Sequence, residues 1–183
     1  VKSVTITHAG GDTVKVVRQA PGADAFTLAS KIPPGREAKA PHELEALASI
    51  TDFLILDDVR AAKELDFATP AVKLETVTFD GLTLRFEGVE KDGTFWVRVA
   101  ATESARDPAL AAFVEANKGQ DSAAGRTAGQ FKAEAEVKAE TAAIQSKTDG
   151  WAYRLTDYKT DKVRTDTQAI TAAVAADAAK AKN

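Results

Sequence analysis

Apolar and polar residues alternate at the start of the chain. Val4 and Ile6 alternate with threonines, and Gly10-Gly11-Asp12 separates them from a second apolar run at 13–17. A period of two is typical of a strand with one buried face, and a glycine-rich break between two such runs favours a turn. We therefore expect a β-hairpin here.

The pattern changes to helical spacing after a proline-rich stretch. Lys31–Arg36 contains two prolines and predicts a surface loop. Pro41 stands at the first turn of an expected amphipathic helix, in which apolar residues recur three and four positions apart up to Ile50. Phe53–Leu56 then predicts a buried strand, and Val59–Leu65 a second short helix.

A similar order of signals returns in the second half of the chain. The run 72–79 leads to Asp80-Gly81, which predicts a hairpin with a type I′ turn. A further turn at Lys91-Asp92-Gly93 opens the expected strand Thr94–Val99. Asp107-Pro108 favours a helix start, with Asp at the N-cap and Pro in the first turn.

The last third of the chain is predicted to be mostly helical. Gln130–Lys147 is rich in Ala, Glu and Lys, all of which favour a helix. Trp151–Leu155 alternates large apolar with small or charged residues and predicts a strand, whose two aromatic side chains we expect in the core. Tyr158–Lys182 is expected to be helical again.

The two halves therefore share an order of elements, and we expect an α+β fold built from two tandem repeats. Each repeat would be a β-hairpin with a third strand, followed by helix, strand and helix, in mixed sheets covered by helices. The first repeat would span 1–68 and the second 69–183, which ends in Ala-rich helices. The pattern leaves open whether the repeats form one rigid body.

Composition excludes several classes of protein. Hydrophobic residues make up 44% and charged residues 28% of the chain, as in ordinary globular proteins. A formal net charge of -3 gives no basic field that would attract nucleic acid. The chain has no Cys, which excludes disulfides, thiolate nucleophiles and cysteine-ligated zinc.

The possible catalytic residues do not form a recognisable motif. His8 and His42 fall on different elements without metal-ligand spacing, and no Gly-x-Ser-x-Gly motif or phosphate-binding glycine loop is present. Asp57, Asp58 and Asp66 would suit acid-base or cation chemistry, but acids at a strand end more often cap a following helix. We therefore predict no enzymatic activity, no metal site and no cofactor.

One possible ligand surface lies on the strand Thr94–Val99. In this strand Trp96 and Arg98 share the face opposite to Phe95. If helices cover the Phe95 face alone, Trp96 is exposed beside Arg98, a pairing that is common at protein or glycan contacts. The alternative is that both faces are covered and that Trp96 belongs to the core.

A series of short motifs runs in order along almost the whole chain. They are Phe26–Leu28, Pro33–Glu37, Leu56–Arg60, Glu64–Phe67, Thr78–Leu82, Trp96, Gly150–Tyr153 and Asp157–Lys159. In these motifs the chain resembles a known family, the bacterial domain of unknown function 4340, whose members accompany gliding-motility-type ABC transporters. Thr156 departs from the family pattern, in which we expect proline before Asp157.

The resemblance implies a setting for the chain. Members of this family carry an N-terminal membrane anchor and extracytoplasmic repeats, and they have no assigned reaction. We therefore expect the chain to be a fragment of a periplasmic protein anchored upstream in the inner membrane. Its expected function is noncatalytic, as an interaction or scaffold domain with protein partners in an ABC-transporter-linked complex. The alternatives are an envelope-polymer hydrolase and a ligand sensor whose sheet edge accepts a partner strand.

Overall fold

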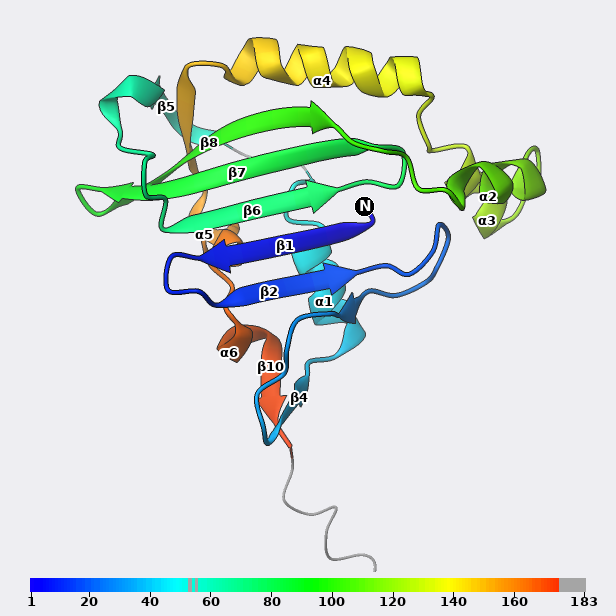
Figure 1. The fold of residues 1–183 in the computed structure, drawn as a ribbon, viewed down its shortest axis with the longest axis horizontal. Coiled ribbons are helices and arrows are strands. Elements are labelled where there is room, and N and C mark those ends of the chain that lie inside the picture. The colour runs from blue at the N-terminus through cyan, green and yellow to red at the C-terminus, as the bar shows by residue number, and fades with distance from the viewer. Residues whose placement is uncertain (53, 55, 175–183) are drawn as a thin grey trace, which may run out of the picture.

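The computed structural model describes residues 1–52, 54 and 56–174 (Figure 1). Its strands are β1 (Ser3–His8), β2 (Thr13–Val17), β3 (Thr27–Leu28), β4 (Arg36–Ala38), β5 (Leu56–Ala61), β6 (Val72–Val77), β7 (Leu82–Lys91), β8 (Thr94–Glu103), β9 (Trp151–Leu155) and β10 (Thr171–Ala173). Its α-helices are α1 (Pro41–Ala48), α2 (Leu110–Asn117), α3 (Ala123–Ala128), α4 (Glu134–Thr148), α5 (Asp157–Val163) and α6 (Thr167–Ile170), and a 3-10 helix, η1, covers Ala62–Glu64.

Eight of the strands form one sheet in the order β3-β2-β1-β6-β7-β8-β9-β5, and β4 pairs with β10 in a separate two-stranded sheet. Every strand pair in the described residues is antiparallel. The predicted α+β class is confirmed, with antiparallel pairing in place of the mixed sheets that we expected.

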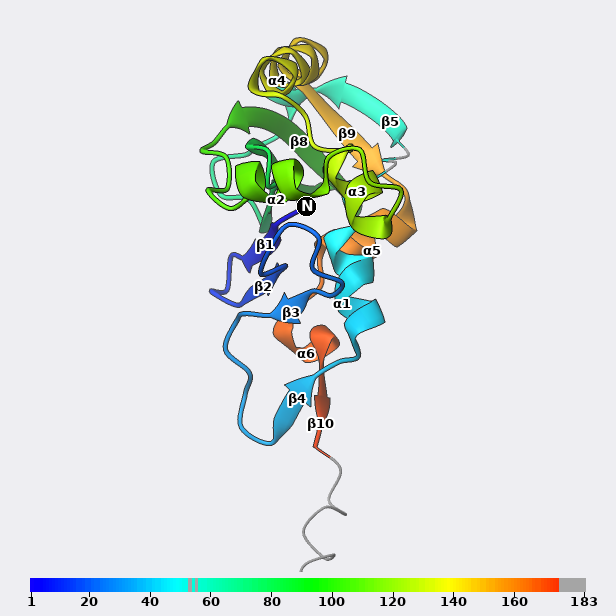
Figure 2. The same ribbon diagram turned by 90° about the vertical axis from the view of Figure 1, so that its right-hand side faces the viewer.

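The main core lies between one face of the sheet and the helices. The alternating residues Val4 and Ile6 of β1 are fully buried on this face, together with Leu74 of β6 and Val97 of β8. The buried leucines of α1 belong to the same cluster. Figures 1 and 2 show α1 behind β1 and β2, and α4 along β8. We refer to this side as the helix face and to the opposite side as the open face.

Both predicted hairpins are present, but the turn at Asp80-Gly81 is not of the predicted type. A type I′ turn requires a positive φ at both central residues. Asp92 and Gly93, between β7 and β8, have φ angles of 53° and 73°. Between β6 and β7, Gly81 has a φ of 99° whereas Asp80 has no positive φ, and the loop closes with Thr78 N–H donating to Leu82 O at 2.9 Å. The predicted type I′ turn at Asp80-Gly81 is therefore wrong, and the turn of that type follows β7.

The helix predicted at 41–50 and the one predicted at Gln130–Lys147 are confirmed as α1 and α4. The strand predicted at Trp151–Leu155 is confirmed as β9. In each case the local sequence pattern and the packing favour the same element.

The predicted helix at Val59–Leu65 is wrong. Residues up to Ala61 belong to β5, which pairs with β9, and the 3-10 helix η1 follows. Hydrogen bonds to a neighbouring strand thus override the local helix propensity of this Ala- and Lys-containing segment. Of the predicted buried strand Phe53–Leu56, residues 53 and 55 lie outside the described residues, and Leu56 is 48% exposed.

The predicted continuous helix from Tyr158 is also wrong over the described residues. Helix α5 ends at Val163, and Asp166 caps the separate helix α6 by accepting a hydrogen bond from Ala169 N–H at 2.7 Å. The chain then forms β10 against β4, where the Arg36 guanidinium donates to Thr171 O at 2.7 Å. Residues 175–183 of this prediction lie outside the described residues.

Strands from both predicted repeats belong to the single large sheet, in which β6–β9 lie between β1 and β5. β1 pairs with β6, and β5 pairs with β9, so each of these pairs joins a strand from 1–68 with one from 69–183. The predicted internal repeat is not confirmed. None of the described helices combines the length and apolar character needed to cross a bilayer.

Candidate functional site

Trp96 is buried and cannot be an exposed ligand anchor. Its side chain is 3% exposed and packs on the open face of the sheet against Phe67, Val89 and Ala152. The segment after η1 carries Phe67 over this end of the face, so that both sides of β8 are covered here. The alternative reading, that Trp96 belongs to the core, is the one that the burial supports.

Arg98 lies on the same face but is engaged within the chain. Its guanidinium forms an ion pair with Glu87 on β7 and lies 4.9 Å from the centroid of the Phe67 ring. The side chain retains 47% of its exposure. Trp96 and Arg98 therefore do not form a joint exposed surface.

A groove of about 450 Å³ crosses the open face from β1 to β8. Its charged side chains pair with one another across the strands. Arg85 pairs with Glu75 at 2.8 Å, and Glu87 lies between Arg98 and Lys73. Because these charges are largely compensated, the groove does not single out an ionic ligand.

His8 and Asp12 connect the first hairpin to the C-terminal segment. The His8 ring Nε2 donates to Thr165 O at 3.0 Å, and the Thr167 N–H donates to the Asp12 carboxylate at 2.8 Å. Burial alone would raise the pKa of Asp12, but the hydrogen bonds from Thr167 outweigh it and hold the pKa below its usual value. Both residues line an open depression of about 1070 Å³, yet their polar atoms are used to hold α6 in place.

The other polar candidates lie apart from these and are exposed. His42 is exposed on α1, and Asp57 and Asp58 are exposed on β5. Asp57 lies 3.7 Å from the Arg154 guanidinium, and Asp58 accepts a hydrogen bond from Val59 N–H at 2.8 Å. The expectation that these two acids cap a helix is wrong, because both lie within a strand.

Asp66 likewise serves its own backbone, accepting a hydrogen bond from Ala68 N–H at 2.9 Å. Within the described part of the chain, no three His, Cys, Asp or Glu side chains gather closely enough to hold a metal ion.

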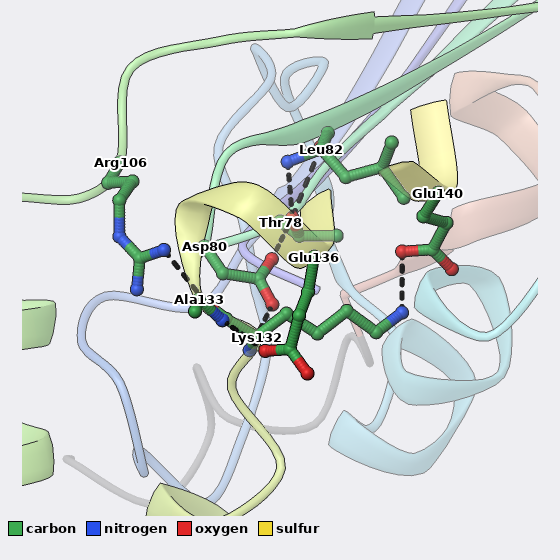
Figure 3. Close-up of polar contacts among 8 residues, drawn as sticks. All are labelled: Thr78, Asp80, Leu82, Arg106, Lys132, Ala133, Glu136 and Glu140. Carbon is green, nitrogen blue, oxygen red and sulfur yellow. Dashed lines mark hydrogen bonds and ion pairs between the residues drawn. The ribbon is translucent and has the colours of Figure 1, made fainter. Parts of the chain in front are cut away.

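A polar cluster surrounds the buried Asp80 at the β6–β7 turn (Figure 3). Thr78 donates its hydroxyl proton to one carboxylate oxygen of Asp80, and Lys132 N–H donates to the other at 3.1 Å. Arg106 donates to Lys132 O at 2.8 Å, and the Lys132 ammonium pairs with Glu140 of α4. The cluster thus joins the turn to the segment that leads into α4, which is a structural role.

The sheet ends at β5, where large apolar side chains are exposed. Figure 2 shows β5 at the outer edge of the sheet, beyond β9. Leu56 and Val59 of β5 are 48% and 51% exposed, and Trp151 of β9 is 47% exposed. Their register partners are Leu155, Tyr153 and Ala61, in that order, so the three exposed side chains lie on the helix face. We call Leu56, Val59 and Trp151 the edge patch.

The edge patch reverses one expectation about the two tryptophans. Trp151 was expected in the core with Tyr153 and Leu155, but of these three only Leu155 is fully buried, while Tyr153 is half-buried and Trp151 is exposed. The alternation of β9 predicted the shared face correctly. It could not show that the helices stop short of the last residue pairs at this edge.

Comparison of the chain with family models, curated proteins and solved structures finds no match.

Proposed function

We propose that the chain is a noncatalytic interaction domain that binds another polypeptide along the edge strand β5. The observation that carries this proposal is the edge patch, in which three large apolar side chains lie about half exposed at the end of the sheet. Exposed edge strands offer unpaired N–H and C=O groups to an incoming strand, and neighbouring apolar side chains add affinity.

The second part of the proposal concerns the setting of the chain. The domain would belong to a membrane-anchored extracytoplasmic protein that is accessory to an ABC-transporter-linked envelope complex. This setting rests on the sequence resemblance alone. Strand addition suits such a role because it joins two chains without requiring a preformed pocket.

A noncatalytic role is supported by the separation of the polar candidates. His42 on α1 and Asp58 on β5 are both exposed, and His8 is engaged with Thr165 O. A hydrolase would need these groups to converge in one cleft, within reach of the scissile bond and of a water molecule. His8 and Asp12 line one open depression, but their polar atoms already bind Thr165 O and the Thr167 N–H. The other candidates lie elsewhere on the described part of the chain, so we do not favour the hydrolase alternative.

The proposal is tested by placing a photoactivatable amino acid at Val59 in the full-length protein in its native envelope. Glu115, an exposed residue of α2, provides the matched control, since α2 lies at the other end of the sheet from β5 (Figure 1). We expect irradiation to give a discrete crosslinked polypeptide from Val59 and none from Glu115. Equal labelling from both positions, or none from Val59, would contradict the proposal.

A further inference from the structure

The hydrogen bonds of β5 define which of its residues face away from the sheet. Ala62 N–H donates to Gly150 O at 2.8 Å. Every second residue of a strand directs its N–H and C=O groups to the same side, so Arg60 also directs its backbone groups toward β9. Val59, one residue before Arg60, directs its backbone groups to the other side, where its N–H donates to the Asp58 carboxylate at 2.8 Å. The backbone N–H and C=O groups of Val59 and Ala61 therefore point outward.

The charges on either side of Val59 are opposite. Asp58 precedes it and Arg60 follows it, and both side chains lie on the open face because they alternate with Val59. In an antiparallel pair of two identical strands centred on Val59, Asp58 of each copy stands directly opposite Arg60 of the other. Such opposite-charge pairs across strands are favourable, and the two-fold axis produces the pair twice.

We propose that the occupant of the β5 edge is a second copy of this chain, paired antiparallel about a two-fold axis at Val59. This inference rests on the proposed function, because it uses the same edge. In the pair, each Val59 N–H exchanges its Asp58 carboxylate for the carbonyl oxygen of the opposite Val59. The two eight-stranded sheets then form one continuous sheet across the axis.

Arg60 is a suitable partner for an incoming carboxylate. Its guanidinium lies 4.2 Å from the centroid of the Trp96 ring, and the buried Nε has no hydrogen-bond partner within the described residues, so an incoming carboxylate would bind the terminal nitrogens. The ring therefore holds the cation in a fixed position without neutralising its charge. On the opposite, helix face, the two edge patches would meet across the axis, which removes apolar surface from water.

The expected association is weak because the edge is short. β5 has six residues, and a strand pair of this length buries less than the area of about 1,200 Å² typical of stable complexes. We therefore expect a concentration-dependent equilibrium between monomer and dimer. Tethering in a membrane would favour the dimer by raising the effective concentration.

A single introduced cysteine tests the position of the axis. The chain contains no Cys, so Val59→Cys creates a unique thiol. In a hydrogen-bonded antiparallel pair the two Cα atoms lie about 5.5 Å apart. This distance falls within the range of about 4.4–6.8 Å that a disulfide requires.

Under mild oxidation we expect Val59→Cys to form a covalent dimer at least about tenfold faster than the control Glu115→Cys, because pairing holds the two thiols together. Equal rates for the two variants would overturn the proposal. Non-reducing gel electrophoresis over a series of protein concentrations measures both rates.

Exchanging the charges at 58 and 60 provides a second test, because dimers formed by random collision would not depend on these charges. Asp58→Lys places two cations opposite each other in its own dimer, and Arg60→Glu places two anions opposite each other, so each variant alone should be monomeric by analytical ultracentrifugation. Mixing the two variants restores opposite charges in both contacts and should produce a heterodimer. A mixture that stays monomeric while the unmodified chain dimerises would overturn the proposed register.

Two variants of Val59 test the pairing of the edge independently, in case Arg60→Glu does not fold. Val59→Pro removes the outward N–H without breaking a bond to β9, and proline is tolerated at such edge positions. Val59→Thr keeps both the N–H and the branched side chain. We expect the proline variant to weaken dimerisation at least about tenfold, equivalent to about 1.4 kcal/mol, and the threonine variant to leave it nearly unchanged.

The photocrosslinking experiment separates this inference from the proposed function. A Val59 product that contains this chain alone supports the dimer. A product with a different polypeptide, combined with no disulfide dimer of Val59→Cys, overturns the dimer and leaves the proposed function standing. The absence of any product specific to Val59 overturns both.

Discussion

The guanidinium of Arg60 on β5 lies over the indole ring of Trp96 on β8, 4.2 Å from the ring centroid. The two residues are separated by β9, where the fully buried Ala152 is small enough to leave room between them. Trp96 thus belongs to a cluster that joins β8 and β9 to the segment after η1. This contact holds the edge strand against the rest of the sheet.

Replacing Trp96 with Ala should therefore destabilise the fold strongly. A large cavity would remain beside Phe67 and Val89, and we expect a loss of about 3–5 kcal/mol in the free energy of unfolding. Trp151→Ala is the matched control, since half of that side chain is already in water, and it should cost less than about 1.5 kcal/mol. Urea denaturation followed by far-UV circular dichroism measures both, and similar losses would contradict the burial of Trp96.

Gly81 and Gly93 provide a second pair of variants. Both have positive φ angles, but a Cβ at Gly81 would lie 2.6 Å from Ser104 O, whereas a Cβ at Gly93 meets nothing within 4 Å. Gly93→Ala should cost about 1 kcal/mol from backbone conformation alone. Gly81→Ala should cost at least about 1 kcal/mol more, because the backbone around Ser104 must move. Equal shifts in the urea midpoint would show that the turn has room for a side chain.

The hydrogen bonds from Thr167 to the Asp12 carboxylate predict a pH-dependent contribution to the stability of the fold. The pKa of Asp12 is lower in the folded chain than its ordinary value of 3.8, so the carboxylate stabilises the fold fully above that value. The contribution is lost as the pH falls through the lower, folded pKa. Asp12→Asn should cost about 1–3 kcal/mol near neutral pH, and the difference from the unmodified chain should shrink below about pH 4.

Urea titrations between about pH 7 and about pH 3 measure this difference. Asp92→Asn is the control, since Asp92 is exposed in a turn and tolerates asparagine at its positive φ. A difference between Asp12→Asn and the unmodified chain that does not change with pH would exclude the ionised carboxylate as its source.

The Asp80 cluster predicts a local effect near α4. Asp80→Asn turns one acceptor oxygen into a donor and removes the hydrogen bond to residue 80 from either the Thr78 hydroxyl or the Lys132 N–H, of which only the hydroxyl has a second acceptor, Leu82 O. We expect a loss of about 1–3 kcal/mol in the free energy of unfolding. Hydrogen exchange of the Lys132 amide should accelerate more than that of Val97, a central residue of the sheet. Equal acceleration of both amides would show that the substitution destabilises the whole fold and not the Asp80 cluster alone.

Elements were predictable where local pattern and packing agree. The alternation of Val4 and Ile6 identifies β1, and the composition of 134–148 identifies α4. β5 was missed because Leu56–Ala61 has two adjacent acids and little alternation, and its strand conformation comes from hydrogen bonds to β9, which is distant in sequence. Propensity carries no information about such a partner.

The candidate site was hidden for a related reason. Alternation shows that Trp96 and Phe95 lie on opposite faces, but the burial of Trp96 depends on where the segment containing Phe67 crosses the sheet. The exposure of Trp151 depends on the strand order, which places β9 beside the edge strand. The signal in the sequence was that the oppositely charged Asp58 and Arg60 flank Val59. This pattern indicates strand pairing only when β5 is known to be an edge strand.

The position of β9 between β8 and β5 also affects the order in which the protein can assemble on the ribosome. β5 is synthesised early, yet its neighbour β9 emerges only after α4 has been made. Until then the nascent chain exposes unpaired edges of both β8 and β5, and such edges readily pair with other chains. Late translation of β9 therefore creates an interval in which chaperone binding would protect the growing polypeptide from misassembly.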